Sequence, residues 1–208
     1  SILAVGSTVY IAATNGRYTY WVGGTHPWAS WNGSNYSGYA TNGLGGGTML
    51  VMFLVNGNIW AAGADGRVGM LTSGTYQTIL GGAGFSIYGG AGKGNTVIVG
   101  GSNGRLQRST DGGVTWDAYI TIFGGTIIND VVYSNGTWCV GGDNGRAAIS
   151  TDDGVTWTQY SSVSGSENIN DVKEVGGVWI AAAINGYIAT LPLQVFPPTG
   201  DMNPAHIV

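Results

Sequence analysis

The stretch that decides the fold is IINDVVYSNGTWCVGGDNGRAAISTDDGVTWTQY, at residues 127–160. It contains four short segments rich in Val, Ile, Thr, Tyr and Trp, separated by the turn sequences SNG, DNG and TDDG. β-Branched and aromatic residues favour strands, and Asn-Gly or Asp-Gly supplies the positive φ of tight hairpin turns. The stretch therefore predicts four antiparallel strands joined by three hairpin turns.

The second of these turns recurs along the chain, in the phrases VYIAATNGRY, IWAAGADGRV, VIVGGSNGRL, WCVGGDNGRA and WIAAAINGYI. Its glycine stands at intervals of 50, 38, 41 and 41 residues, at Gly16, Gly66, Gly104, Gly145 and Gly186. A unit of four strands repeated at about 40 residues is typical of a β-propeller blade. A parallel β-solenoid is the alternative, but its repeats are shorter and do not need three hairpin turns per unit.

We therefore expect an all-β fold, a β-propeller of about five four-stranded blades with Asp-Gly turns. The domain covers 1–196 and a C-terminal tail covers 197–208, with blades at about 1–47, 48–80, 81–120, 121–160 and 161–196. The first blade carries an insertion, WNGSNYSGYATNGLGGG, and the fifth has only LPLQVF as a fourth strand.

Composition narrows the classes of partner. The 208 residues include 39 glycines, only 9% are charged, and the net charge is −4, so the basic surface of a nucleic-acid-binding protein is missing. No apolar run approaches the roughly 20 residues of a membrane helix, and the start SILAVGSTVYIAA lacks the basic region of a signal peptide. Cys139 is alone and lies in a strand pattern, which favours a buried structural thiol. We expect neither nucleic-acid binding nor membrane insertion.

Two acidic turns share one pattern, S-x-D-x-G-x-T-W. Aspartate beside glycine is also found in calcium loops, but these turns lack ligands at alternate positions and the distal bidentate glutamate. A structural turn explains every position, because Asp and Ser bond turn amides, Gly takes positive φ and Trp packs over the hairpin. The pattern residues are Ser109, Asp111, Gly113, Thr115 and Trp116 in the first acidic turn, and Ser150, Asp152, Gly154, Thr156 and Trp157 in the second.

This pattern resembles the Asp-box, or BNR, repeat of a family of β-propellers. The longer phrase VGGSNGRLQRSTDGGVTW is similar to repeats of photosystem assembly-factor propellers and of phage and bacterial propeller proteins. The resemblance is strong over 81–160 and weaker outside, where the second blade has LTSGTYQTIL in place of the box. It implies that the boxes tie the outer two strands together away from the ligand face, and that Asp111 and Asp152 are not catalytic.

The same family includes sialidases and endoglucanases, so an enzyme is an alternative. A sialidase needs an arginine cluster and a tyrosine–glutamate pair, whereas four of the five arginines here occupy one repeated turn position. A paired-carboxylate glycosidase could use Asp130, Asp171 or Glu174. The two histidines, His26 and His206, are isolated and give neither a metal pair nor a catalytic triad. We predict no catalytic residues, no metal and no cofactor.

The repeated arginines are the first candidate ligand-binding residues. In a four-stranded blade, their turns and the acidic turns lie at opposite ends of the strands. The arginines would form a ring opposite the acidic turns, completed by a tyrosine in the fifth blade, and could contact an anion or a partner. The structural alternative is that each guanidinium caps strand carbonyls or stacks on an aromatic ring. The ring consists of Arg17, Arg67, Arg105, Arg146 and Tyr187.

The insertion in the first blade is the second candidate. Trp31, Tyr36 and Tyr39 lie in it among several asparagines, and aromatic rings with amides suit a glycan, although tyrosines are equally common at protein interfaces. The repeated Ile-Asn-Asp at 128–130 and 169–171 lies near the same end of the blades, where side-chain capping is the structural reading.

The sequence as a whole predicts a non-catalytic recognition or assembly module that binds other protein subunits of a larger assembly, with a cell-surface glycan as a further partner. The resemblance implies a phage virion component, in the tail or in receptor binding, and hence a location in the virion or outside the cell. A bacterial lectin or assembly factor is the alternative, and an Asp-box glycoside hydrolase is the third.

Overall fold

The computed structural model describes residues 2–5, 8–12, 18–22, 48–70, 77–80, 82 and 84–191, the first three segments as backbone alone. Within these residues the chain forms five antiparallel sheets, which we call blades 1 to 5 in chain order. Blades 2, 3 and 4 have four strands, and three strands are described in each of blades 1 and 5. The predicted all-β fold is confirmed.

The strands of each blade follow one another in space as they do in sequence, so every pairing is between chain neighbours. Blade 1 contains β1 (Ile2–Val5), β2 (Thr8–Ala12) and β3 (Tyr18–Val22). Blade 2 contains β4 (Met49–Val55), β5 (Asn58–Gly63), β6 (Arg67–Met70) and β7 (Gln77–Thr78). Blade 3 contains β8 (Ile87–Lys93), β9 (Thr96–Gly101), β10 (Arg105–Ser109) and β11 (Ile120–Thr121).

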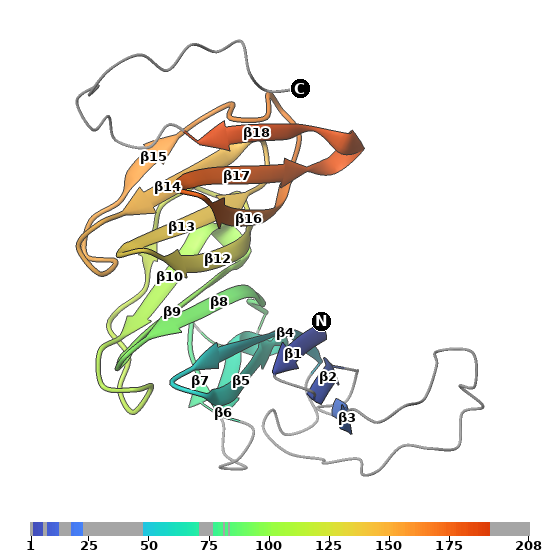
Figure 1. Ribbon diagram of the computed structural model, residues 1–208. Coiled ribbons are helices and arrows are strands. Elements are labelled where there is room, and N and C mark those ends of the chain that lie inside the picture. Colours follow the sequence, from blue (N-terminus) through green and yellow to red (C-terminus); the bar gives the residue numbers. More distant parts are fainter. Residues whose placement is uncertain are drawn as a thin grey trace.

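Blade 4 contains β12 (Ile128–Ser134), β13 (Thr137–Gly142), β14 (Arg146–Ser150) and β15 (Thr158–Tyr160). Blade 5 contains β16 (Ile169–Val175), β17 (Val178–Ala183) and β18 (Ile188–Leu191). Figure 1 shows the five blades fanned along a curved row, with blades 1 and 5 at its two ends.

The turns between the second and third strands have the backbone that the sequence predicts. Three of them are single 3-10 turns, η2 (Ala64–Gly66), η3 (Ser102–Gly104) and η4 (Ile184–Gly186). In blade 4 the corresponding pair, Asn144 and Gly145, has φ values of 59° and 64°. Asparagine and glycine accept this left-handed conformation most readily, so the recurring Asn-Gly explains where each strand reverses.

Hydrogen bonds place these turns and the acidic turns at opposite ends of the blades. In blade 3 the amide of Gly112, in the acidic turn, donates to the carbonyl of Asn95, between the first two strands, at 2.8 Å. At the other end the amide of Ile122, which leads into blade 4, donates to the carbonyl of Gly104 at 2.9 Å. The arginine turns therefore share their end of the blade with the connections between blades.

The first strand of each of blades 2 to 5 has a β-bulge after its first residue. The pairing shifts between Met49 and Val51 in β4, and the same shift recurs in β8, in β12 between Ile128 and Asp130, and in β16. A bulge re-aims the side chains that follow it. In blade 4 this brings Asp130 to the side that faces blade 5.

The hydrophobic core lies between blades rather than within one. One cluster joins blades 2 and 3, a second joins blades 3 and 4, and a third joins blades 4 and 5. Trp138 and Trp179, on the second strands of blades 4 and 5, are the largest fully buried side chains. Blades 2 to 5 are thus stabilised by the apolar surfaces that they share with one another.

The fourth strands are shorter than the sequence predicts. The pattern at 155–160 suggests a strand of six residues, whereas β15 begins at Thr158, because the residues before it belong to the acidic turn. β11 ends at Thr121, one residue beyond the expected limit of its blade. The insertion of blade 1, most of LPLQVF and the C-terminal tail lie outside the described residues. No helix in the part described has the length and apolar character to cross a membrane.

Candidate functional site

Arg105 is held by the chain that enters its own blade. Its Nη1 donates to the carbonyl of Leu80 at 2.5 Å. Its guanidinium carbon lies 3.6 Å from the centre of the Phe85 ring and 4.1 Å from that of Tyr119. A cation between two aromatic faces is attracted by both, and its planar donors are fixed.

Arg146 makes the same carbonyl contact one blade later, since its Nη1 donates to Phe123 at 2.9 Å. Both arginines are half-buried and make the contacts of the structural alternative. Arg67 begins β6 at the equivalent position and is also half-buried. Binding of an anion by these residues stays a prediction. Arg17, Trp31, Tyr36 and Tyr39 lie outside the described residues.

Tyr187 replaces the arginine in blade 5 and is exposed, at 56%. It therefore belongs to a different environment from Arg105 and Arg146, on a blade that has only one neighbour among the described residues.

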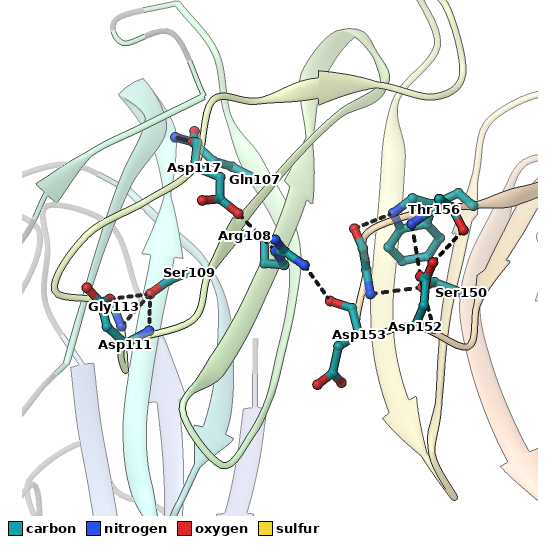
Figure 2. Close-up of polar contacts among 12 residues, drawn as sticks. Gln107, Arg108, Ser109, Asp111, Gly113, Asp117, Ser150, Asp152, Asp153 and Thr156 are labelled. Atoms are coloured by element: carbon teal, nitrogen blue, oxygen red, sulfur yellow. Dashed lines mark hydrogen bonds and ion pairs between the residues drawn. The ribbon is translucent and has the colours of Figure 1, made fainter.

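The first acidic turn is closed by a ring of hydrogen bonds. Ser109, which is buried, accepts from the amide of Gly113 at 2.8 Å and donates to Asp111 Oδ1 at 2.8 Å. Asp111 in turn accepts from the amide of Thr115 at 2.8 Å and from its hydroxyl at 2.5 Å. Figure 2 shows Ser109 with Asp111 and Gly113 in the first turn, and Ser150 with Asp152 in the second.

The second acidic turn repeats this network almost atom for atom. Gly154 donates to Ser150 Oγ at 2.8 Å, and Asp152 accepts from the Thr156 amide at 2.9 Å and from its hydroxyl at 2.6 Å. These bonds, those from the threonine first, lower the pKa of Asp111 and of Asp152 to about 2. Both carboxylates are ionised acceptors at neutral pH, which suits a turn and does not suit a general acid.

Each acidic turn also packs on the blade before it. Gly113 lies directly against the ring of Trp60 in blade 2, and Gly154 lies against Ile98 in blade 3. Trp116 packs against the core shared by blades 2 and 3, and Trp157 against the core shared by blades 3 and 4. The turns therefore join blades as well as strands.

Sequence reasoning left one arginine without a role. Arg108, at the end of β10, donates from Nε to Asp117 Oδ2 at 2.9 Å and from Nη1 to the carbonyl of Asp153 in the next blade at 3.2 Å (Figure 2). It lines a small cavity of about 120 Å³ between blades 3 and 4, with Ile98, Leu106 and Trp157. Its departure from the repeat was the only signal in the sequence, because no other blade has an arginine at that position.

The Ile-Asn-Asp repeats lie where blades 4 and 5 meet. Asp130 accepts from the amide of Val131 and, through Oδ2, from the amide of Val172 in blade 5, both at 2.9 Å. Asn129 donates to the carbonyl of Ile169 at 3.0 Å. Capping by these side chains, the structural reading, is thus seen between blades.

Burial is the main cause of a raised pKa at Asp130, about 7, and the nearby Asp171 contributes. Both Asp130 oxygens already accept backbone amides, so this carboxyl group is engaged in joining blades. Cys139, buried beside it, has its thiol pKa raised by the same loss of solvation. Among the described residues no group of three or more His, Cys, Asp or Glu side chains could hold a metal ion.

Blade 5 exposes an apolar surface on the side away from blade 4. We call this surface the open face. It consists of the blade 5 residues that correspond, 41 positions on, to the blade 4 residues that face blade 5: Asp171, Lys173, Val175, Ile180, Ala182, Ile188 and Thr190. Ile188 is 74% exposed and Val175 is 59% exposed. Apolar side chains gathered in this way are typical of a surface that another protein covers.

The sequence matches no protein-family profile and no curated protein. Its structure is similar to the structure of U3-55K, with 11% identity and a TM-score of 0.64 over 88% of this chain and 57% of that one. It is also similar to the WD40 repeats of RRP9, with 10% identity and a TM-score of 0.66 over 88% and 56%. The computationally designed Ika8 protein matches with 13% identity and a TM-score of 0.62 over 92% and 57%.

These identities are low, so the likeness concerns the fold alone, which is that of a β-propeller. The chain spans little more than half the length of each of these proteins.

Proposed function

We propose that this chain is a non-catalytic recognition and assembly propeller of the Asp-box type, which binds other protein subunits of a larger particle. The observation that carries the proposal is the open face of blade 5. Burying an apolar side chain such as Ile188 is worth about 1.5–3 kcal/mol, so this face favours binding to a protein surface. The exposed Tyr187 beside it is of a residue type that is enriched at interfaces.

The charged residues support a non-catalytic role. Asp111 and Asp152 are bound within their turns, Asp130 joins two blades, and Glu174 accepts from Ser134 and Asn135 at 2.9 Å across the same joint. Each of these carboxylates therefore has a structural task that accounts for its position.

The setting that we propose is a phage particle, as a tail or receptor-binding component, and hence a virion or extracellular location. The similarity of residues 99–116 to phage propeller repeats supports it. The low content of charged residues, 9%, suits a subunit whose surface is largely covered in an assembly.

Site-specific photocrosslinking in the native particle tests the proposal. A photoreactive residue is placed at Ile188 on the open face or, as a control, at Val155, which is 59% exposed on the second acidic turn. We expect crosslinks to a protein subunit from position 188 and few from position 155. Equal yields at the two positions would contradict the proposal.

The alternatives give different results. Glycan-array binding that is lost in Tyr36→Ala and Tyr39→Ala would identify a lectin. Turnover of a fluorogenic glycoside that is lost in Asp130→Ala would identify an enzyme.

A further inference from the structure

The joint between blades 4 and 5 shows which contacts bind one blade to the next. Three side chains of blade 4 pack against Ile169 and Trp179 of blade 5 and are at most 5% exposed: Cys139, Ala147 and Ile149. At the inner strands, Asp130 receives the Val172 amide and Asn129 donates to Ile169, as described above. An apolar patch and two side-chain-to-backbone hydrogen bonds therefore hold one blade on the next.

Blade 5 repeats the same arrangement of side chains on its side away from blade 4. Ile180, Ile188 and Thr190 stand where blade 4 has Cys139, Ala147 and Ile149, and Asp171 stands where blade 4 has Asp130. Ala147 is fully buried, whereas the equivalent Ile188 is 74% exposed.

Asp171 is exposed as well; it lies 3.2 Å from Lys173 of its own strand and near Asp130, whose pKa it helps to raise. The open face thus has the apolar patch and the carboxylate of an inter-blade joint.

Blade 1 provides a matching surface at the other end of the row. The pairing of β1 with β2 and of β2 with β3 places Ile2, Val9, Ile11 and Trp21 at positions on one face of that sheet. Counted from the turn between the first two strands, Val9 corresponds to Trp138 and Ile2 to Val131. In blade 4 these two positions belong to the core shared with blade 3. The face of blade 1 is therefore of the kind that receives a preceding blade.

We infer that the open face of blade 5 binds blade 1 of a second copy of this chain, so that copies join head to tail. The inference rests on the proposed function and names its partner. The interface continues the joint that already links the blades within the chain, with Asp171 accepting the amide of Ile2 as Asp130 accepts that of Val172. Because the two surfaces differ, the contact is heterologous and builds a ring or an open filament rather than a two-fold dimer.

Sedimentation velocity of the 208-residue protein at about 1–100 µM, a range that spans weak to moderate protein association, tests the inference. We expect the mean mass to rise with concentration. Ile188→Asp introduces a charge at a site that is 74% exposed, so the fold tolerates it, and should weaken association at least about tenfold. Val155→Asp, equally a charge at an exposed valine, should leave association unchanged.

A mixing experiment tests the head-to-tail geometry. Ile188→Asp blocks the open face, and Val9→Asp, or a bulky soluble domain fused ahead of Ser1, blocks blade 1. Each variant alone should stay monomeric, and the two together should form a one-to-one dimer that grows no further, because one competent surface remains on each.

Three results would overturn the inference: a monomer at every concentration, association that Ile188→Asp leaves intact, or association that neither block on blade 1 reduces. The last result would mean that two open faces meet each other. A monomer that still crosslinks from position 188 to another subunit in the particle would remove this inference and leave the proposed function standing.

Discussion

Ser109 and Ser150 lie at the centre of the acidic turns, and each side chain is only 1% exposed. Each hydroxyl accepts a hydrogen bond from the amide of the turn glycine and donates one to the aspartate, so one oxygen serves two groups. The aspartate, which the sequence makes conspicuous, closes the outer half of the ring. The stability of the turn therefore depends on the buried serine as much as on the exposed acid.

Ser109→Ala should lower the free energy of unfolding by about 1–3 kcal/mol, because the Gly113 amide, buried in the turn, loses its acceptor. Denaturant unfolding followed by tryptophan fluorescence measures the change. Thr110→Ala, at the next and exposed residue, is the control and should change stability by less than about 0.5 kcal/mol. Equal losses in the two variants would contradict the role assigned to the serine.

Arg105 gives the clearest separation of a structural role from a binding role. Arg105→Met removes the bond to Leu80 and the charge between Phe85 and Tyr119, and should cost about 1–3 kcal/mol of stability. Unfolding curves of the two proteins give the difference. Unchanged stability together with weaker binding of an anionic ligand would instead favour the binding role.

The titration of Asp130 should make the folded protein less stable as the pH rises. Its folded-state pKa is about 7 against an ordinary 3.8, so between these values the folded protein holds more protons than the unfolded chain. The free energy of unfolding should therefore fall as pH rises through this window. Asp130→Asn should remove this part of the slope. Unfolding of both proteins measured from pH 4 to pH 8 is the test, and parallel curves would show that Asp130 does not titrate there.

At the scale of elements, the first acidic turn packs on the preceding blade through its second glycine. The packing is so close that this position has no room for a side chain. Gly112 and Gly113 are neighbours with positive φ, 74° and 83°, but only Gly113 lies against Trp60. A substitution at either position strains the backbone, and one at Gly113 also displaces the indole ring.

Gly113→Ala should therefore destabilise the protein more than Gly112→Ala, with a loss of about 1–3 kcal/mol beyond the backbone strain that both share. Comparing the two unfolding midpoints isolates the contact between blades. If the two variants lost the same stability, the strain alone would account for both.

The positions of strands and turns could be predicted from the sequence where the residues of a short segment determine its conformation. The Asn-Gly turns and the short apolar runs of β13 and β17 specify their own conformation, so the order of the strands followed from them. Contacts between blades did not follow in the same way. Asp130 and Val172 are 42 residues apart, and nothing near Asp130 marks its partner. Arg108 is similar, because its two partners come from the segment before the fourth strand of its own blade and from the next acidic turn.

At the scale of the whole molecule, blades 2 to 5 are stabilised mainly by their chain neighbours. The three buried clusters each join two consecutive blades, and Figure 1 shows the first and last blades at the two ends of the row. Such an arrangement behaves as a one-dimensional array, in which inner units gain two interfaces and a terminal unit gains one. Blade 5 is the terminal unit whose side chains are described.

Hydrogen exchange should therefore be graded along the row. Trp138 on β13 is fully buried, with blades 3 and 5 on either side, whereas β18 has Ile188 open to solvent. We expect amides of β9 and β13 to exchange more slowly than those of β17 and β18, because local opening of blade 5 disrupts a single interface. Mass spectrometry of peptides from dilute protein gives the gradient.

Raising the protein concentration should slow exchange in β17 and β18 if copies join through the open face, and Ile188→Asp should abolish that change. Uniform protection along the row at low concentration would show that the blades unfold as a single cooperative unit.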